Sequence, residues 1–400
     1  MSEVQPQAGR SVKHRLRAWF GAGPRRHGEP IQGRSVSYLE LFYDLVFVVL
    51  VGQAAHTLAA HPGWRGTAEF VAVFGLVWNA WINGTLYHEL HGRDDGRSRF
   101  YVFAQMGVLA VLAVFTGYAG TTDGTAFALT YSVLLLLLFW QWYEVRRHDL
   151  PEDKPASTPY LLSLAVTIVV MVASAWLPET GRLGAWLAIV AGWVALGVYG
   201  FVGRGRPLTY FSATESLVER MALFVIIVLG ETVVGVVNGI GETDRDALTV
   251  TTGVFGLCIG FGIFWNYFDV VGAREPRSDR RALATWFFGH LPLTGAVAVT
   301  GAAMVGLVIN AHVPRTPAPV AFTLGGAVAV ILLLIAAESS SVEQVDAIDA
   351  RTRTRVYLAG AGLVLLLALV APAPWLLALL VIGVLSLTWL SSFVPPDRKA

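Results

Sequence analysis

The feature that most constrains this chain is a series of twelve apolar runs, each long enough to cross a lipid bilayer as a helix. Short polar or Pro/Gly-rich turns separate the runs, and only Pro372 and Pro374 divide the last two. Ten to twelve spans are therefore expected, in an all-α, polytopic transmembrane helix bundle. The runs cover residues 38–60, 67–90, 100–119, 124–144, 158–177, 183–202, 210–239, 247–271, 282–310, 317–337, 354–371 and 373–393.

The composition leaves too little polar surface for a soluble globule, with 55% hydrophobic residues, 14% charged residues and a mean hydropathy of +0.58. Cys258 is the single cysteine, so no disulfide within the chain is possible and no Cys/His cluster suggests zinc or iron–sulfur. The sequence contains no Walker A loop, GxSxG elbow or HExxH helix. We therefore expect no cofactor and no metal, and any driving force must come from a gradient.

The basic residues are distributed asymmetrically between the two sides of the predicted bundle. With the amino terminus in the cytoplasm, 24 of the 29 Lys and Arg residues fall on the cytoplasmic side. The other five are Arg65, Arg182, Arg245 and Arg315, which face out, and Arg220 within a span. This pattern predicts an even number of spans with both termini in the cytoplasm. The predicted parts are a basic cytoplasmic leader (1–36), two six-helix halves (37–205 and 206–394) and a cytoplasmic tail (395–400).

A fragment of the second apolar run recurs in the eighth, 181 residues later. An even number of spans in each half makes the expected six-plus-six duplication a parallel one, and substrate sites of such proteins lie where the halves meet. The matching stretches are Val73-Phe74-Gly75-Leu76 and Val254-Phe255-Gly256-Leu257, then Trp78-Asn79 and Trp265-Asn266, and more loosely Leu50-Val51-Gly52-Gln53 and Val228-Leu229-Gly230-Glu231.

Ionisable groups within spans cost on the order of 3 kcal/mol each, so each one is a functional hypothesis. Glu40 and Asp44 share one face of the first span, and Glu215 and Glu219 share one face of the seventh. Paired carboxylates repel unless a proton or a cation lies between them, and Arg220 is the obvious candidate partner. The alternative is an ion pair that only fixes helix packing. We prefer this alternative for Glu40, Glu215 and Glu219.

Glu231 differs from these groups because it lies about 24 Å along the helix axis from Glu215, inside the hydrocarbon. No basic residue is near it in its own helix, so this carboxyl is suited to carry a proton or bind a cation. The alternative is a neutral acid that is hydrogen-bonded in a static core.

Three further polar residues lie in the second half of the chain. His290 precedes Pro292 in an apolar helix, where an imidazole and a freed carbonyl could line a cavity, although a core histidine explains it equally well. Asn266 and Asp269 lie at the end of the eighth span, where Asp269 could simply cap the helix or reach the interface.

The stretch Ser37-Tyr38-Leu39-Glu40-Leu41-Phe42-Tyr43-Asp44-Leu45-Val46-Phe47-Val48 resembles the bacterial low temperature requirement A family of membrane proteins. The resemblance continues at Glu219-Arg220-Met221, Gly230-Glu231-Thr232, Trp265 to Asp269 and Gly289-His290-Leu291-Pro292, and it covers about residues 35 to 393. The resemblance implies a multi-spanning inner-membrane protein associated with growth in the cold. It does not indicate which biochemical activity such a protein has. The chain departs from the family at Asn83 to Glu89, where members have Asn-Arg-Phe-Asp.

These observations favour a gradient-driven transporter or an ion- or proton-conducting protein. Two alternatives are an intramembrane lipid-modifying enzyme, with carboxylates and His290 as general acid and base, and a non-catalytic sensor or partner of other membrane proteins. The expected partners are the bilayer, anionic lipid at the basic leader, and a small solute or ion, but no nucleic acid. The candidate pathway residues are Glu231, Asp44, Glu219, Arg220, His290, Glu40, Asp269 and Asn266.

Overall fold

The computed structural model describes residues 19–21, 23–29, 34, 36–202, 213–272, 274–343 and 350–393. Within these residues, 12 helices are long and apolar enough to cross a membrane, which confirms the all-α, polytopic prediction. They are α2 (Tyr38–Ala60), α3 (Trp64–His91), α4 (Gly96–Thr116), α5 (Gly124–His148), α6 (Lys154–Ser174), α7 (Glu179–Val202), α8 (Glu215–Gly241), α9 (Ala247–Tyr267), α10 (Arg280–Ile309), α11 (Ala318–Ser339), α12 (Ala350–Val370) and α13 (Pro374–Leu390). A π-helical turn η1 (Phe268–Gly272) extends α9, and a 3-10 turn η2 (Ser391–Phe393) follows α13.

Local capping sets where several helices begin. Thr214 caps α8 by accepting the Leu217 N–H on its hydroxyl at 3.2 Å, so this helix begins at Glu215, whereas the apolar run begins at residue 210. Ser37 and Glu40 form a capping box at the start of α2, since each side chain accepts the backbone N–H of the other. Glu40 thus helps to cap the start of α2, a role that its position in the sequence did not indicate.

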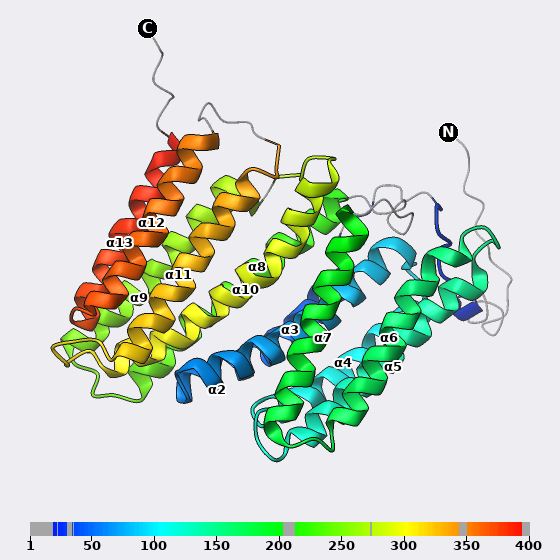
Figure 1. Ribbon diagram of the computed structural model, residues 1–400, viewed down its shortest axis with the longest axis horizontal. Helices are drawn as coiled ribbons and strands as arrows, with labels where there is room; N and C mark the ends of the chain where they lie inside the picture. Colours follow the sequence, from blue (N-terminus) through cyan, green and yellow to red (C-terminus); the bar gives the residue numbers. More distant parts are fainter. Residues whose placement is uncertain are drawn as a thin grey trace, which may run out of the picture.

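The helices form two groups that lie side by side, α2–α7 and α8–α13 (Figure 1). In the first group α2 packs on α3 and α4, α4 on α5, α5 on α6, and α3 on α7. In the second group α8 packs on α9 and α10, α10 on α11, α11 on α12, and α9 on α13. The order of neighbours is therefore the same in both groups, and the duplication itself stays a prediction.

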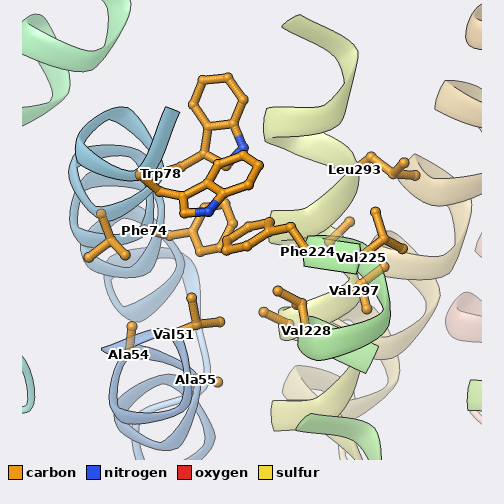
Figure 2. Close-up of a cluster of buried hydrophobic side chains, with 14 of the residues drawn as sticks. Val51, Ala54, Ala55, Phe74, Trp78, Phe224, Val225, Val228, Leu293 and Val297 are labelled. Carbon is orange, nitrogen blue, oxygen red and sulfur yellow. The ribbon is translucent and has the colours of Figure 1, made fainter. Parts of the chain in front are cut away.

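The two groups meet where α2 and α3 contact α8 and α10. Side chains from all four helices converge there in a buried apolar cluster, including Val51, Phe74, Phe224 and Val297 (Figure 2). The repeat drew attention to the eighth span, but α9 packs on α8, α10 and α13 within its own group. Helix α10 takes the place at the contact between the halves that the repeat suggested for α9.

Glycines allow α8 and α10 to approach closely. A Cβ added at Gly235 would lie 2.1 Å from the backbone oxygen of Gly301, and one added at Gly301 would lie 2.7 Å from the backbone oxygen of Glu231. Membrane helices lack a hydrophobic driving force for association, so such small residues provide close van der Waals packing. The closely packed α8–α10 pair therefore fixes the positions of Arg220 and Glu231, which both belong to α8.

Replacing Gly235 by valine should lower the free energy of unfolding by about 1–3 kcal/mol, because the added methyl groups meet backbone that has no room to move. Thermal unfolding in detergent, followed by circular dichroism, measures this change. Gly230→Val is the matched control on the same helix, since nothing lies within 4 Å of a Cβ there. Equal destabilisation by both variants would contradict the packing argument.

Part of the basic leader packs against the end of α5. The His27 backbone N–H and Nδ1 both contact the carboxylate of Asp149, at 3.0 and 2.8 Å. Burial raises the pKa of Asp149, but the hydrogen bonds from His27 outweigh burial, so this pKa lies below its ordinary value. Residues 1–18 lie outside the described residues, so contact between the leader and anionic lipid stays a prediction.

Candidate functional site

The centre of the site is a buried ion pair between the two halves. Arg220 of α8 donates from Nη2 to Oδ1 of Asp44 of α2 at 2.6 Å, and both side chains are fully buried. The indole N–H of Trp81, on α3, donates to the same oxygen at 2.8 Å. The hydrogen-bonding capacity of the pair is not used up, because no described residue bonds Asp44 Oδ2, Arg220 Nε or Arg220 Nη1.

Of the two carboxylate pairs for which Arg220 was the candidate partner, the structure joins it to the pair that contains Asp44. Glu215 and Glu219 are exposed on the outside of α8, whereas Arg220 points into the bundle. Successive residues on a helix are about 100° apart, so Glu219 and Arg220 cannot share a face. The structure therefore joins Arg220 to Asp44, 176 residues away in the chain.

A second ion-pair cluster lies toward the end of the bundle where α2 begins. Arg34 bonds the carboxylates of both Glu40 and Glu89, with Glu89 contributed by the last turns of α3. Ser216 and Thr214 also donate to Glu89, at 2.8 and 2.7 Å. This cluster joins α2, α3 and the start of α8, about one helical turn from the Asp44–Arg220 pair.

Glu231 lies at the junction of α2, α8 and α10, with only 8% of its surface exposed. A Cβ added at Gly52 of α2 would lie 2.9 Å from Glu231 Oε1, so the carboxylate occupies space that this glycine leaves free. No described residue forms a hydrogen bond or an ion pair with it. Arg220 is eleven residues earlier on the same helix, about 16 Å along the axis.

His290 belongs to another buried cluster, formed by α9, α10 and α11. Its Nδ1 is 2.6 Å from the carbonyl oxygen of Trp286, and its Nε2 is 2.8 Å from the hydroxyl of Tyr267. A carbonyl only accepts, so Nδ1 carries the proton of this bond; in the neutral imidazole the Tyr267 hydroxyl donates to Nε2, and in the imidazolium Nε2 donates to the hydroxyl oxygen. The fully buried Glu338 carboxylate lies 3.5 Å from Nδ1, and no described residue bonds either of its oxygens.

Glu338 was missed at the sequence level because the predicted tenth span ended at residue 337 and a loop was expected from Glu338 to Arg353. The structure corrects this boundary, since α11 continues to Ser339 and Glu338 occupies its last turn. The first half has a neutral polar pair on α4 and α5, the helices equivalent to α10 and α11 in the order of neighbours. There Gln105 donates to Gln141 at 2.5 Å.

Asn266 and Asp269 bond to residues outside these clusters. The Asn266 amide donates to Gly262 and Leu385 oxygens and accepts from Tyr357 and Thr388 hydroxyls, so it joins α9, α12 and α13. Asp269, in η1, accepts the indole N–H of Trp389 at 2.6 Å. Both residues hold α13 against the end of α9. No group of three His, Cys, Asp or Glu residues that could hold a metal ion occurs in the described part of the chain.

Comparison with known proteins supports the family resemblance that the residues around the Asp44–Arg220 pair carry. The profile of "Bacterial low temperature requirement A protein (LtrA)" matches residues 35–391. This chain belongs to the LtrA family. An uncharacterized protein of Rhizobium meliloti (strain 1021) is 28% identical over 286 residues, which cover 66% of this chain and 67% of that protein. The chain has no significant match among solved structures.

The LtrA motif residues Asp44 and Arg220 thus pair directly, Glu40 lies in the neighbouring ion-pair cluster, and His290 lies in a separate cluster. The chain departs from the family at the end of α3, but Glu89 still forms an ion pair there, with Arg34. Arg34 stands three residues before the first family motif and could have been recognised as its cationic partner. Trp81 carried no such signal, because its role depends on the packing of α3 against α2.

Proposed function

We propose that this LtrA-family protein conducts protons or another small cation across the membrane, driven by a gradient. The pathway follows the contact between the halves, from Glu40 past the Asp44–Arg220 pair to Glu231, and the His290–Glu338 pair supplies a second set of titratable groups. In this proposal one end of the bundle faces the cytoplasm of a bacterial inner membrane, namely the end that carries the Arg-rich loops Arg93–Arg99 and Arg274–Arg281.

One observation carries the proposal: ionisable groups are buried at the α2–α8 contact without a full set of partners. A charge in the membrane interior is tolerated when it is paired or lines an ion path. Arg220 and Asp44 pair through one nitrogen and one oxygen, and their remaining side-chain polar atoms lack protein partners among the described residues. Static packing alone would favour complete pairing, as Asn266 demonstrates.

An apolar barrier separates the Asp44–Arg220 pair from Glu231. On α8, Phe224 and Val228 lie between Arg220 and Glu231, at successive steps of four residues, so they share the face of Arg220. Val51 lies opposite them on α2, and Figure 2 shows these side chains directed toward one another. All three are buried. Hydrophobic constrictions of this kind gate ion paths by excluding water, so we identify this as a closed state.

Replacing Glu231 by glutamine should reduce flux at least about tenfold, because the amide neither binds a proton nor neutralises a cation. The measurement is proton and sodium flux in proteoliposomes of purified protein, with imposed pH and sodium gradients. Glu242→Gln, at the exposed carboxyl end of the same helix, is the matched control and should conduct like the unmodified protein. Normal flux through the folded Glu231→Gln variant would overturn the assignment of this residue.

A lipid-modifying enzyme has weaker support. Such an enzyme needs acid and base groups on a cavity that opens sideways to the bilayer. A groove of this kind exists beside α10, but its lining in the described residues contains no ionisable side chain. His290 is directed instead toward Tyr267 and Glu338.

A further inference from the structure

A long apolar groove lies between the halves, on the membrane-facing side of the contact. It has a volume of about 840 Å³ and is lined by α3 and α7 of the first half and by α10 and α11 of the second. Its walls are aromatic and aliphatic, and part of the lining faces outward, since Phe322 is 49% exposed and Val71 is 47% exposed. The groove is therefore open to the hydrocarbon of the bilayer.

The position of the groove matches one leaflet of the membrane. Along α11 it extends from Ala318 to Val330, about 18 Å at 1.5 Å per residue. One leaflet of the hydrocarbon core is about 15 Å thick. The groove begins at Trp64 and Ala318, at the end of the bundle opposite the Arg-rich loops.

Polar groups gather at the outer end of the groove. Trp64 is 84% exposed, as expected for an aromatic anchor at the membrane surface. It also lines a smaller adjoining pocket with Arg65 and Glu179, which form an ion pair at 2.9 Å. The apolar groove is thus continuous with charged groups at the depth of lipid headgroups.

The lining of the groove and the groups at its outer end fit a lipid chain. The described lining contains no ionisable side chain, and an acyl chain is thin and needs no polar partner. The Arg65–Glu179 pair beside Trp64 supplies charged groups where a lipid headgroup would lie. We propose that the groove binds an acyl chain of a phospholipid in the outer leaflet, with the headgroup at Trp64.

The inference concerns lipid binding and does not depend on ion conduction. Gly326 offers a direct test, because it lines the groove and nothing lies within 4 Å of a Cβ added there. Gly326→Trp should fill the groove without displacing a neighbour. Gly362→Trp is the matched control, since Gly362 of α12 is equally open and lies outside the groove lining.

The experiment uses the full chain in vesicles of phosphatidylethanolamine and phosphatidylglycerol that contain a phosphatidylcholine with a diazirine in one acyl chain. Photolabelled peptides are identified by mass spectrometry. We expect labelling concentrated on residues 67–75, 291–299 and 318–330 in the unmodified protein and in Gly362→Trp, and reduced at least fivefold in Gly326→Trp. Gly326→Leu, a smaller filler, takes the place of Gly326→Trp if the larger variant does not fold.

Two results would overturn the proposal. Labelling spread evenly over all exposed helices and unchanged by Gly326→Trp would mean that only bulk lipid surrounds the protein. Absence of lipid label from the groove, together with cross-links between copies through a cysteine placed at Phe322, would mean that a second copy covers it.

Discussion

Asp44→Asn should lower the free energy of unfolding by about 3–5 kcal/mol, because it leaves the Arg220 guanidinium buried without a compensating charge. The amide keeps an oxygen for the Trp81 indole, so the change isolates the charge of the pair. Both side chains are fully buried, and solvent cannot replace the lost partner. Denaturant titration of the purified protein in mixed micelles measures the change.

The double variant Asp44→Asn/Arg220→Met is the control for this prediction. Removing both charges leaves no uncompensated ion, and apolar replacements of buried pairs are often neutral or stabilising. The double variant should therefore recover most of the lost stability. If single and double variants are equally unstable, the ion pair is not what holds α2 against α8.

Val228→Thr should raise proton flux at least about tenfold, which corresponds to a barrier lower by about 1.4 kcal/mol. Threonine has nearly the shape of valine, but its hydroxyl gives water a partner at the apolar barrier between Arg220 and Glu231. Val228 is fully buried there. The same proteoliposome assay measures the leak, with a small imposed pH gradient.

Val237→Thr makes the same chemical change on the same helix at a position that is 61% exposed. It should leave flux unchanged, because it lies outside the bundle. Unaltered flux through Val228→Thr, in protein that conducts normally, would mean that ions do not pass the Phe224–Val228 level. The proposed route along α2 and α8 would then be wrong even if conduction itself is confirmed.

Much of the architecture could be predicted from the order of residues alone. Apolar runs of about 20 residues and the asymmetry of Lys and Arg depend only on the chain and the bilayer, since each helix satisfies its own backbone. The predicted spans agree with the twelve helices to within a few residues. The differences arise at capped ends, such as Thr214 before α8, and at Glu338, one residue beyond its apolar run.

Which residues meet in one site was harder to predict than which residues are candidates for it. Glu40, Asp44, Arg220 and Glu231 stood out because charges in spans are costly, and that cost acts on each residue separately. Their partners depend on which helices pack together. Arg220 has two carboxylates within five residues on its own helix, Glu215 and Glu219, yet it pairs with Asp44 of another helix.

The order of residues alone shows that this chain crosses the membrane many times, which LtrA motifs it carries and which side chains are costly to bury. The packing of the helices adds that α10 contacts the first half, that Asn266 of α9 bonds residues of α12 and α13, and that Val51, Phe224 and Val228 lie in one buried apolar cluster. The physical reason is that hydropathy is a property of single segments. Pairing and cavities arise from the relative positions of helices that lie far apart in the chain.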